Sequence, residues 1–259
     1  MSLRPVKDKH SISRSVVNLF LAQNFPESEI ILRKIIASDK FATYSRKGTI
    51  SEKLIQFGDR NISVSDNKNS GFVLERFENG SSSDILKMEN TPNGKSILSI
   101  ETRNYTRWQH FVEKITQDLS DLSAFKNFYV EAIGLTYVDE FIWESSGEMA
   151  IEEIFNTNSQ MLNEKFLKSK TSSIVSTFVD TQVSGYGLSE EKSEISFNEH
   201  LKRVIISHTY ILQFQKLKEL DGESYNSFIS EFDSIHSKNK EFLQDILSEN
   251  TQGLINLNI

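Results

Sequence analysis

Two stretches of the sequence gather side chains that could do chemistry. The first, RNYTRWQHFVEKI (residues 103–115), holds two arginines, a tyrosine, a tryptophan and a histidine within eight residues. Basic and aromatic side chains at this density could form a surface that binds a ligand or partner. Arg103 and Arg107 are therefore candidate binding residues. The alternative is that they are solvated residues flanking the start of a helix.

The second stretch, RVIISHTYILQF (residues 203–214), reads as a strand. Its even-numbered residues share one face, because side chains alternate along a strand. His208 and Tyr210 would then lie among apolar neighbours and could be the polar groups of a pocket lined by the sheet. The alternative is a core histidine whose hydrogen bonds are satisfied by Tyr210 or by the backbone.

Other signatures of chemistry are missing from the sequence. The chain has five histidines but no HExxH pair, and it has no P-loop, nucleotide-binding glycine motif or serine nucleophile elbow. It has no cysteine, which excludes disulfides, thiol catalysis and thiolate metal sites. We therefore expect no catalytic residue, no metal site and no cofactor.

A helix should follow the first stretch. Thr106 and Gln109 have the spacing of a capping box, which satisfies free N–H groups where a helix begins. Apolar residues then recur every three or four positions and mark one helical face. They are Trp108, Phe111, Val112, Ile115, Leu119 and Leu122. The sequence thus predicts that Trp108 packs in the core and that His110 faces water.

The remaining patterns predict strands and one more long helix. Alternating runs flank Asn-Gly pairs at 79–80 and 93–94, which favour tight hairpin turns. Residues 128–143 read as a long strand, and residues 225–247 as an amphipathic helix. We therefore expect an α+β fold in which antiparallel sheets are each covered by a long amphipathic helix. An N-terminal half (1–145) and a C-terminal half (171–259) would be joined by a connecting helix (146–170), and the halves could be related.

Three motifs resemble those of a sporadically distributed family of uncharacterised bacterial and archaeal proteins. They are a Tyr-x-x-Trp helix start (Tyr105, Trp108), a Gly-Leu-Arg-Tyr-Ile-Asn-like strand (here Gly134 to Asp139), and a last helix with His236 and Phe242. Thr136 and Asp139 stand where the family has Arg and Asn, so a site built on those two residues would be altered here. The resemblance implies no enzyme class. The scattered occurrence of the family implies a mobile or defence-linked role.

Charge is distributed unevenly along the chain. Residues 1–130 carry 19 Lys and Arg against 15 Asp and Glu, while residues 131–259 carry 10 against 21. The excess in the first half is too small for a nucleic-acid-binding domain. No apolar run is long enough to span a membrane and no signal peptide is evident, so we expect a cytoplasmic protein with no membrane partner.

These observations favour a non-catalytic binding or regulatory module that recognises a protein partner or forms a homo-oligomer. The alternative hypothesis is an enzyme with a sheet-lined pocket around His208 and Tyr210. Nucleic acid is not an expected partner.

Overall fold

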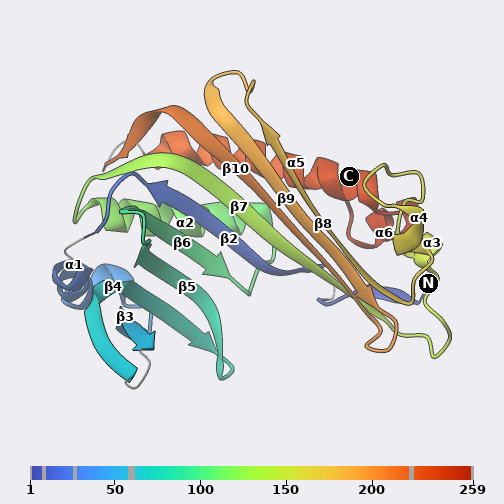
Figure 1. Cartoon of the computed structure of the whole chain (residues 1–259), viewed down its shortest axis with the longest axis horizontal. Helices are drawn as coiled ribbons and strands as arrows, with labels where there is room; N and C mark the ends of the chain where they lie inside the picture. The colour runs from blue at the N-terminus through green and yellow to red at the C-terminus, as the bar shows by residue number, and fades with distance from the viewer. Residues whose placement is uncertain (1, 8–9, 26–27, 58–61, 222–224, 258–259) are drawn as a thin grey trace.

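One antiparallel sheet of ten strands dominates the fold (Figure 1). The computed structural model describes residues 2–7, 10–25, 28–57, 62–221 and 225–257. The strands lie in the order β3-β4-β5-β6-β2-β7-β10-β9-β8, and β1 pairs with the end of β7. Their bounds are β1 Leu3–Pro5, β2 Ile12–Leu21, β3 Arg46–Phe57, β4 Ile62–Glu78, β5 Ser81–Asn90, β6 Ser96–Thr102, β7 Phe128–Trp143, β8 Thr171–Asp180, β9 Tyr186–Asn198 and β10 Arg203–Leu220.

This arrangement corrects the predicted fold class. We expected an α+β fold with separate sheets, each covered by a long helix and built from related halves. Instead, strand accounts for 46% of the structure and helix for 27%, and strands from both halves share one sheet. The halves join at its centre, where β7 pairs with β2 on one side and with β10 on the other. Local patterns located the strands, but they carry no information about which distant strand becomes a neighbour.

The two longest helices, α2 (Trp108–Ser123) and α5 (Tyr225–Ile246), lie on the same face of the sheet, behind it in Figure 1. Along β2 and β6, buried residues on this face alternate with residues on the opposite face that are only partly buried. The sheet is therefore a single layer with one helix-covered face and one open face. The shorter helices are α1 Ser28–Ile36, a 3₁₀ turn at Asp39–Phe41, α3 Ile151–Ile154, α4 Glu164–Leu167 and α6 Glu249–Leu254.

The turns and several elements lie where the sequence placed them. Asn79 and Gly80 join β4 to β5 with φ angles of 51° and 80°, and Gly94 has a φ of 83° between β5 and β6. Positive φ at these positions is what the Asn-Gly pairs predicted. The long strand at residues 128–143 is confirmed with the predicted bounds. Residues 146–170 differ, because they form the two short helices α3 and α4 rather than one connecting helix.

The helix-covered face holds two apolar clusters, and α5 reaches both. Phe228, Phe232 and Ile235 belong to the first cluster, beside α1 and α2, while Phe242 and Ile246 belong to the second, near β1 and α3. The stretch of α5 between them is more polar and bonds to the middle of the sheet. In the part of the chain that the structure describes, no helix has the length and apolar character needed to cross a bilayer.

Candidate binding site

The first candidate stretch lies where β6 gives way to α2. The helix begins at Trp108, and its N-cap residue, Arg107, makes no side-chain capping bond. The predicted capping box is therefore not formed. Thr106 Oγ1 lies 2.9 Å from His110 Nδ1 instead, and Arg107 Nε donates to His110 Nε2 at 2.9 Å. Thr106 and Arg107 thus both bond to His110 on the exposed side of the helix.

Arg107 borders a cleft, whereas Arg103 does not. The cleft has a volume of about 240 Å³ and lies between the β4–β6 strands and the start of α2. Arg103 is held outside the cleft by two hydrogen bonds. Its Nε donates to Glu101 at 2.7 Å and its carbonyl oxygen accepts from Lys7 at 2.6 Å. The structure therefore separates the two arginines that the sequence analysis grouped together.

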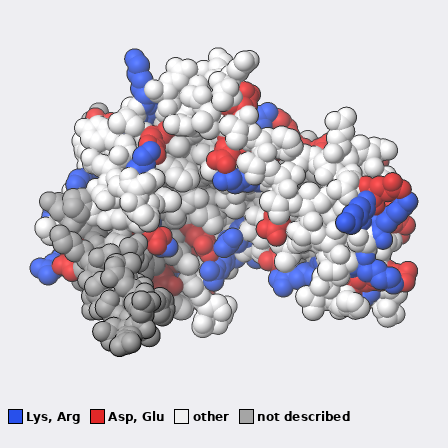
Figure 2. All heavy atoms as spheres, viewed as in Figure 1, with Lys and Arg blue, Asp and Glu red and all other residues white. Residues whose placement is uncertain are grey.

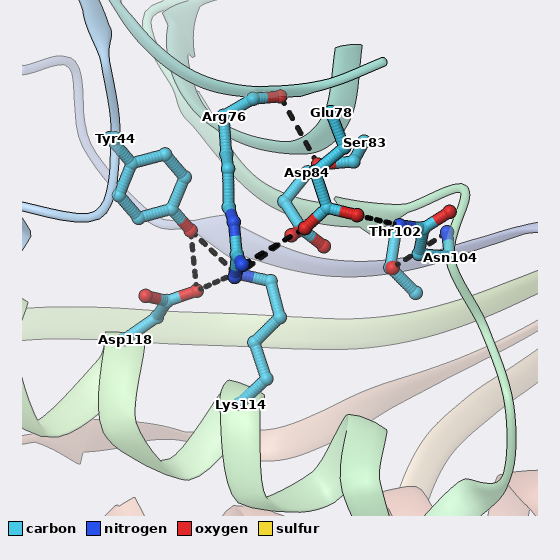
Figure 3. Close-up of polar contacts among 9 residues, drawn as sticks. All are labelled: Tyr44, Arg76, Glu78, Ser83, Asp84, Thr102, Asn104, Lys114 and Asp118. Carbon is cyan, nitrogen blue, oxygen red and sulfur yellow. Dashed lines mark hydrogen bonds and ion pairs between the residues drawn. The ribbon is translucent and has the colours of Figure 1, made fainter. Parts of the chain in front are cut away.

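Two cations of this cleft, Lys114 and Arg76, lie beside carboxylates, as Figure 3 shows. Lys114 Nζ donates to Tyr44 Oη at 2.6 Å and to Asp118 Oδ2 at 2.9 Å, and Tyr44 Oη donates to the same carboxylate at 2.8 Å. Arg76 lies 2.9 Å from Glu78 and 3.9 Å from Asp84. Burial raises the pKa of Asp118, although Lys114 opposes the shift. Carboxylates thus neutralise Lys114 and Arg76, whereas Arg107, which also lines the cleft, bonds to His110.

Trp108 lies between α2 and α5 and is partly buried, packed against the first apolar cluster. Its ring stacks on His236 at 4.5 Å, and its Nε1 donates to Asp233 at 2.6 Å.

Trp108→Ala should lower the free energy of unfolding by about 2 kcal/mol, less than for a fully buried tryptophan. Arg107→Ala should change it by less than about 0.5 kcal/mol, because that side chain is exposed. Urea unfolding of both variants checks this, and equal losses would contradict it.

His208 is enclosed rather than presented to a pocket. It is 1% exposed, with Nδ1 lying 2.9 Å from Asn239 Oδ1 and Nε2 lying 3.0 Å from Glu191 Oε1. The ring of Phe242 stacks on it at 4.2 Å. Both ring nitrogens thus have partners, which matches a satisfied core histidine, though with partners other than those expected. Tyr210, two residues along the strand, is only partly buried.

Four of the residues that carried the family resemblance meet in space. Tyr105 packs edge-on against Tyr137 with ring centres 5.7 Å apart, and Tyr137 Oη lies 2.9 Å from His236 Nδ1. Trp108 completes the group through its stacking on His236. Thr136 faces the other way, where its hydroxyl lies 2.8 Å from that of Thr209. Thr136 and Asp139, the two positions that differ from the resembled strand motif, therefore lie on opposite faces of the sheet.

Tyr137 and His208 are direct neighbours across β7 and β10, and α5 supplies a partner to each of them. Tyr137 meets His236, and His208 meets Asn239. We call these four residues (Tyr137, His208, His236 and Asn239) the polar seam, because His236 and Asn239 lie on α5 between its residues in the first cluster and those in the second. Their mutual bonds fix where α5 rests on the sheet.

A buried carboxyl lies beside the polar seam. Asp139 is 1% exposed, and Ser11 Oγ donates to its Oδ1 at 2.5 Å. Among the described residues, its Oδ2 has no hydrogen-bond partner. Burial raises the pKa of Asp139 to about 6. Burial and the charge of Lys240 lower the pKa of His236 to about 4.

The sheet ends in an open edge at β8. Among the strands that the structure describes, it pairs with β9 alone, and its sequence from Thr171 to Val179 contains no charged residue and no proline. Large apolar side chains point into solvent along it, with Val175 72% exposed, Phe178 56% and Val179 58%. Free edges of this kind are normally protected by charges, proline or a covering element, because they readily pair with another strand.

The backbone of β8 is also accessible. The N–H of Glu199 donates to Lys170 O at 3.0 Å, and these two residues continue the β8–β9 register. In an antiparallel ladder, hydrogen-bonded pairs recur at every second residue. Because Lys170 belongs to such a pair, the N–H and C=O groups of the even-numbered β8 residues point toward β9. The peptide groups of the odd-numbered residues, among them Val175, then point outward from the sheet.

Comparison with known proteins identifies no relative from which a function could be inferred. The chain matches no known family model, no curated protein and no solved structure. What the protein does must therefore be argued from its geometry.

The sequence analysis did not single out β8. The signal was present, since nine successive residues without a charge, Thr171 to Val179, follow the polar segment ending at Lys170. Such a run fits a central strand or an unprotected edge equally well. Only the order of strands in the sheet distinguishes the two.

Proposed function

We propose that the protein is a non-catalytic binding module that recognises an extended segment of protein and adds it as a further strand at β8. The supporting observation is the β8 edge itself, which combines outward-pointing peptide groups with exposed apolar side chains. Strand addition uses both features, because backbone hydrogen bonds supply affinity and alternate side chains supply specificity.

The other functions considered have less support. An enzyme centred on His208 would need a reactive ring nitrogen, and both nitrogens are bonded within the core. Nucleic acid needs a broad positive surface, whereas Figure 2 shows Lys and Arg interspersed with Asp and Glu over the face in view. The proposal includes a cytoplasmic location, supported by the cysteine-free sequence.

Val175→Pro tests this proposal. Proline at this position removes an outward N–H but leaves the bonds to β9 intact, because those come from even-numbered residues. Val175→Thr is the matched control, since it keeps both the N–H and the β-branched shape. Peptides selected from a random display library on the parent protein should bind Val175→Thr unchanged and Val175→Pro at least about tenfold more weakly.

Two results would contradict the proposal. One is a library that yields no enriched peptide. The other is a set of peptides that bind Val175→Pro as tightly as the parent. Circular dichroism of both variants shows whether they keep the parent fold.

A further inference from the structure

The two edges of the sheet differ in how they are protected. At one edge, β3 begins with two charged residues, Arg46 and Lys47. At the other edge, β8 carries only Asp180, at its last position. Charges on an edge strand prevent unwanted pairing. A chain that protects one edge and leaves the other apolar is suited to pairing at the second.

We propose that the strand added at β8 is the β8 of a second copy of this chain, which makes the protein a two-fold symmetric homodimer. This inference rests on the proposed function and names its partner. The two strands run antiparallel, with the two-fold axis perpendicular to the sheet at Ser176. The helix-covered faces of the two copies then lie on the same side, and the sheets join into one.

The position of the axis follows from the side chains. An axis perpendicular to the sheet keeps each face on its own side, so opposed residues must both be even-numbered or both odd-numbered. Centring on Ser176 sets Ile174 opposite Phe178 of the second copy, and this apolar pair occurs twice. Paired aromatic and β-branched side chains stabilise adjacent strands. Moving the axis to Val175 would set Phe178 opposite Ser172 and leave its ring poorly covered.

The charges near β8 do not oppose this pairing. Asp180 would face Ser172 of the second copy, a possible hydrogen-bond donor, rather than another carboxylate. The nearest acidic side chains on the next strand are Glu190, Glu191 and Glu194. The two β9 strands would be three strand spacings apart, about 14 Å. That exceeds the Debye length of about 8 Å at physiological salt, so repulsion between them is largely screened.

The size of the contact predicts a reversible dimer. Four odd-numbered residues of each copy would exchange about eight backbone hydrogen bonds across the axis. A single pair of strands buries less than the roughly 1,200 Å² at which stable interfaces begin. We therefore expect a dissociation constant in the micromolar range, with the same edge available to other strands when the dimer dissociates.

Cysteine scanning tests the dimer directly, because the natural chain has no cysteine. In this register Ser176 opposes itself in a non-hydrogen-bonded pair, whose Cα separation of about 4.5 Å suits a disulfide. Under mild oxidation, Ser176→Cys should form a covalent dimer at least about tenfold faster than Leu217→Cys. Leu217 is the control because it is exposed on β10, away from the β8 edge.

Sedimentation of the unsubstituted chain from about 1 to about 200 µM completes the test. A concentration-dependent dimer that Val175→Pro weakens at least tenfold and Val175→Thr does not supports the proposal. A monomer throughout the range, or a dimer unaffected by Val175→Pro, overturns it. If the chain stays monomeric while selected peptides still depend on Val175, the second copy is excluded and strand addition at β8 stands.

Discussion

Asp139→Asn is expected to raise the free energy of unfolding at pH 7 by about 2–3 kcal/mol. The buried carboxyl has a pKa of about 6 in the folded protein, against an ordinary value of 3.8. Between these values the folded state holds a proton that the unfolded chain has released, so stability falls as pH rises. Above both pKa values Asp139 is ionised in the folded and the unfolded state, and the full loss of stability caused by its burial remains. Asparagine carries no charge and can still accept the hydrogen bond from Ser11.

His236 has the opposite effect over nearly the same range. Its folded pKa of about 4 lies below the ordinary 6.5, so the unfolded chain takes up a proton first as pH falls. Stability contributed by the neutral ring is fully present above 6.5 and is lost as pH falls toward 4. His236→Gln should remove this fall in stability at low pH, and the glutamine still places an amide near the Tyr137 hydroxyl. In the parent protein the two slopes largely offset each other.

Urea unfolding at a series of pH values from 4 to 7 separates these effects. Asp139→Asn should steepen the fall in stability toward low pH, because the opposing contribution of Asp139 is then absent. His236→Gln should have the opposite effect and make the protein more stable toward low pH than the parent, because the opposing contribution of His236 is then absent. His110→Gln is the control, since that histidine is exposed on α2. Parallel pH curves for the parent and both variants would show that neither group titrates as its burial requires.

Gly71→Ala is expected to lower the free energy of unfolding by about 3 kcal/mol. A Cβ atom at Gly71 would lie 1.9 Å from the carbonyl oxygen of Met88 on the adjacent β5. Backbone atoms cannot rotate away as a side chain can, so β4 and β5 would have to separate locally. The effect should spread to Phe72, the neighbouring residue, which is fully buried in the first apolar cluster.

Gly48→Ala is the matched control for this substitution. Gly48 also lies in a strand, β3, but among the described residues no heavy atom beyond Gly48 and its two chain neighbours lies within 4 Å of a Cβ placed there. It should be neutral or slightly stabilising, because alanine reduces the freedom of the unfolded chain. Chemical denaturation of both variants decides the matter. Similar stabilities for the two would mean that β4 and β5 move apart at little cost.

The features that sequence predicted well are those encoded by near neighbours. The Asn79-Gly80 turn depends on residues that tolerate positive φ, and α2 depends on an apolar stripe with helical spacing. The helix start was predicted less well. Thr106 could cap it or bond to His110, and the spacing of Thr106 and Gln109 cannot distinguish the two.

The features that sequence missed depend on distant residues. Tyr137 and His236 are 99 positions apart, so no local pattern shows that they bond. The single sheet depends in the same way on β2, β7 and β10 becoming neighbours. Arg103 and Arg107 illustrate the converse, because closeness in sequence did not place them in one site. Whether a strand is central or lies at an edge is a property of the whole sheet.

The central position of β7 has a consequence for synthesis on the ribosome. Its neighbour β2 is made before it, but its other neighbour, β10, begins only at Arg203. At roughly 5–20 residues per second, the intervening residues 144–202 take several seconds to synthesise. During that time the N-terminal strands can pair. One edge of β7 stays exposed, as do the apolar residues of the sheet that α5 covers in the finished fold. We therefore expect the nascent chain to be most prone to aggregation just before β10 and α5 emerge.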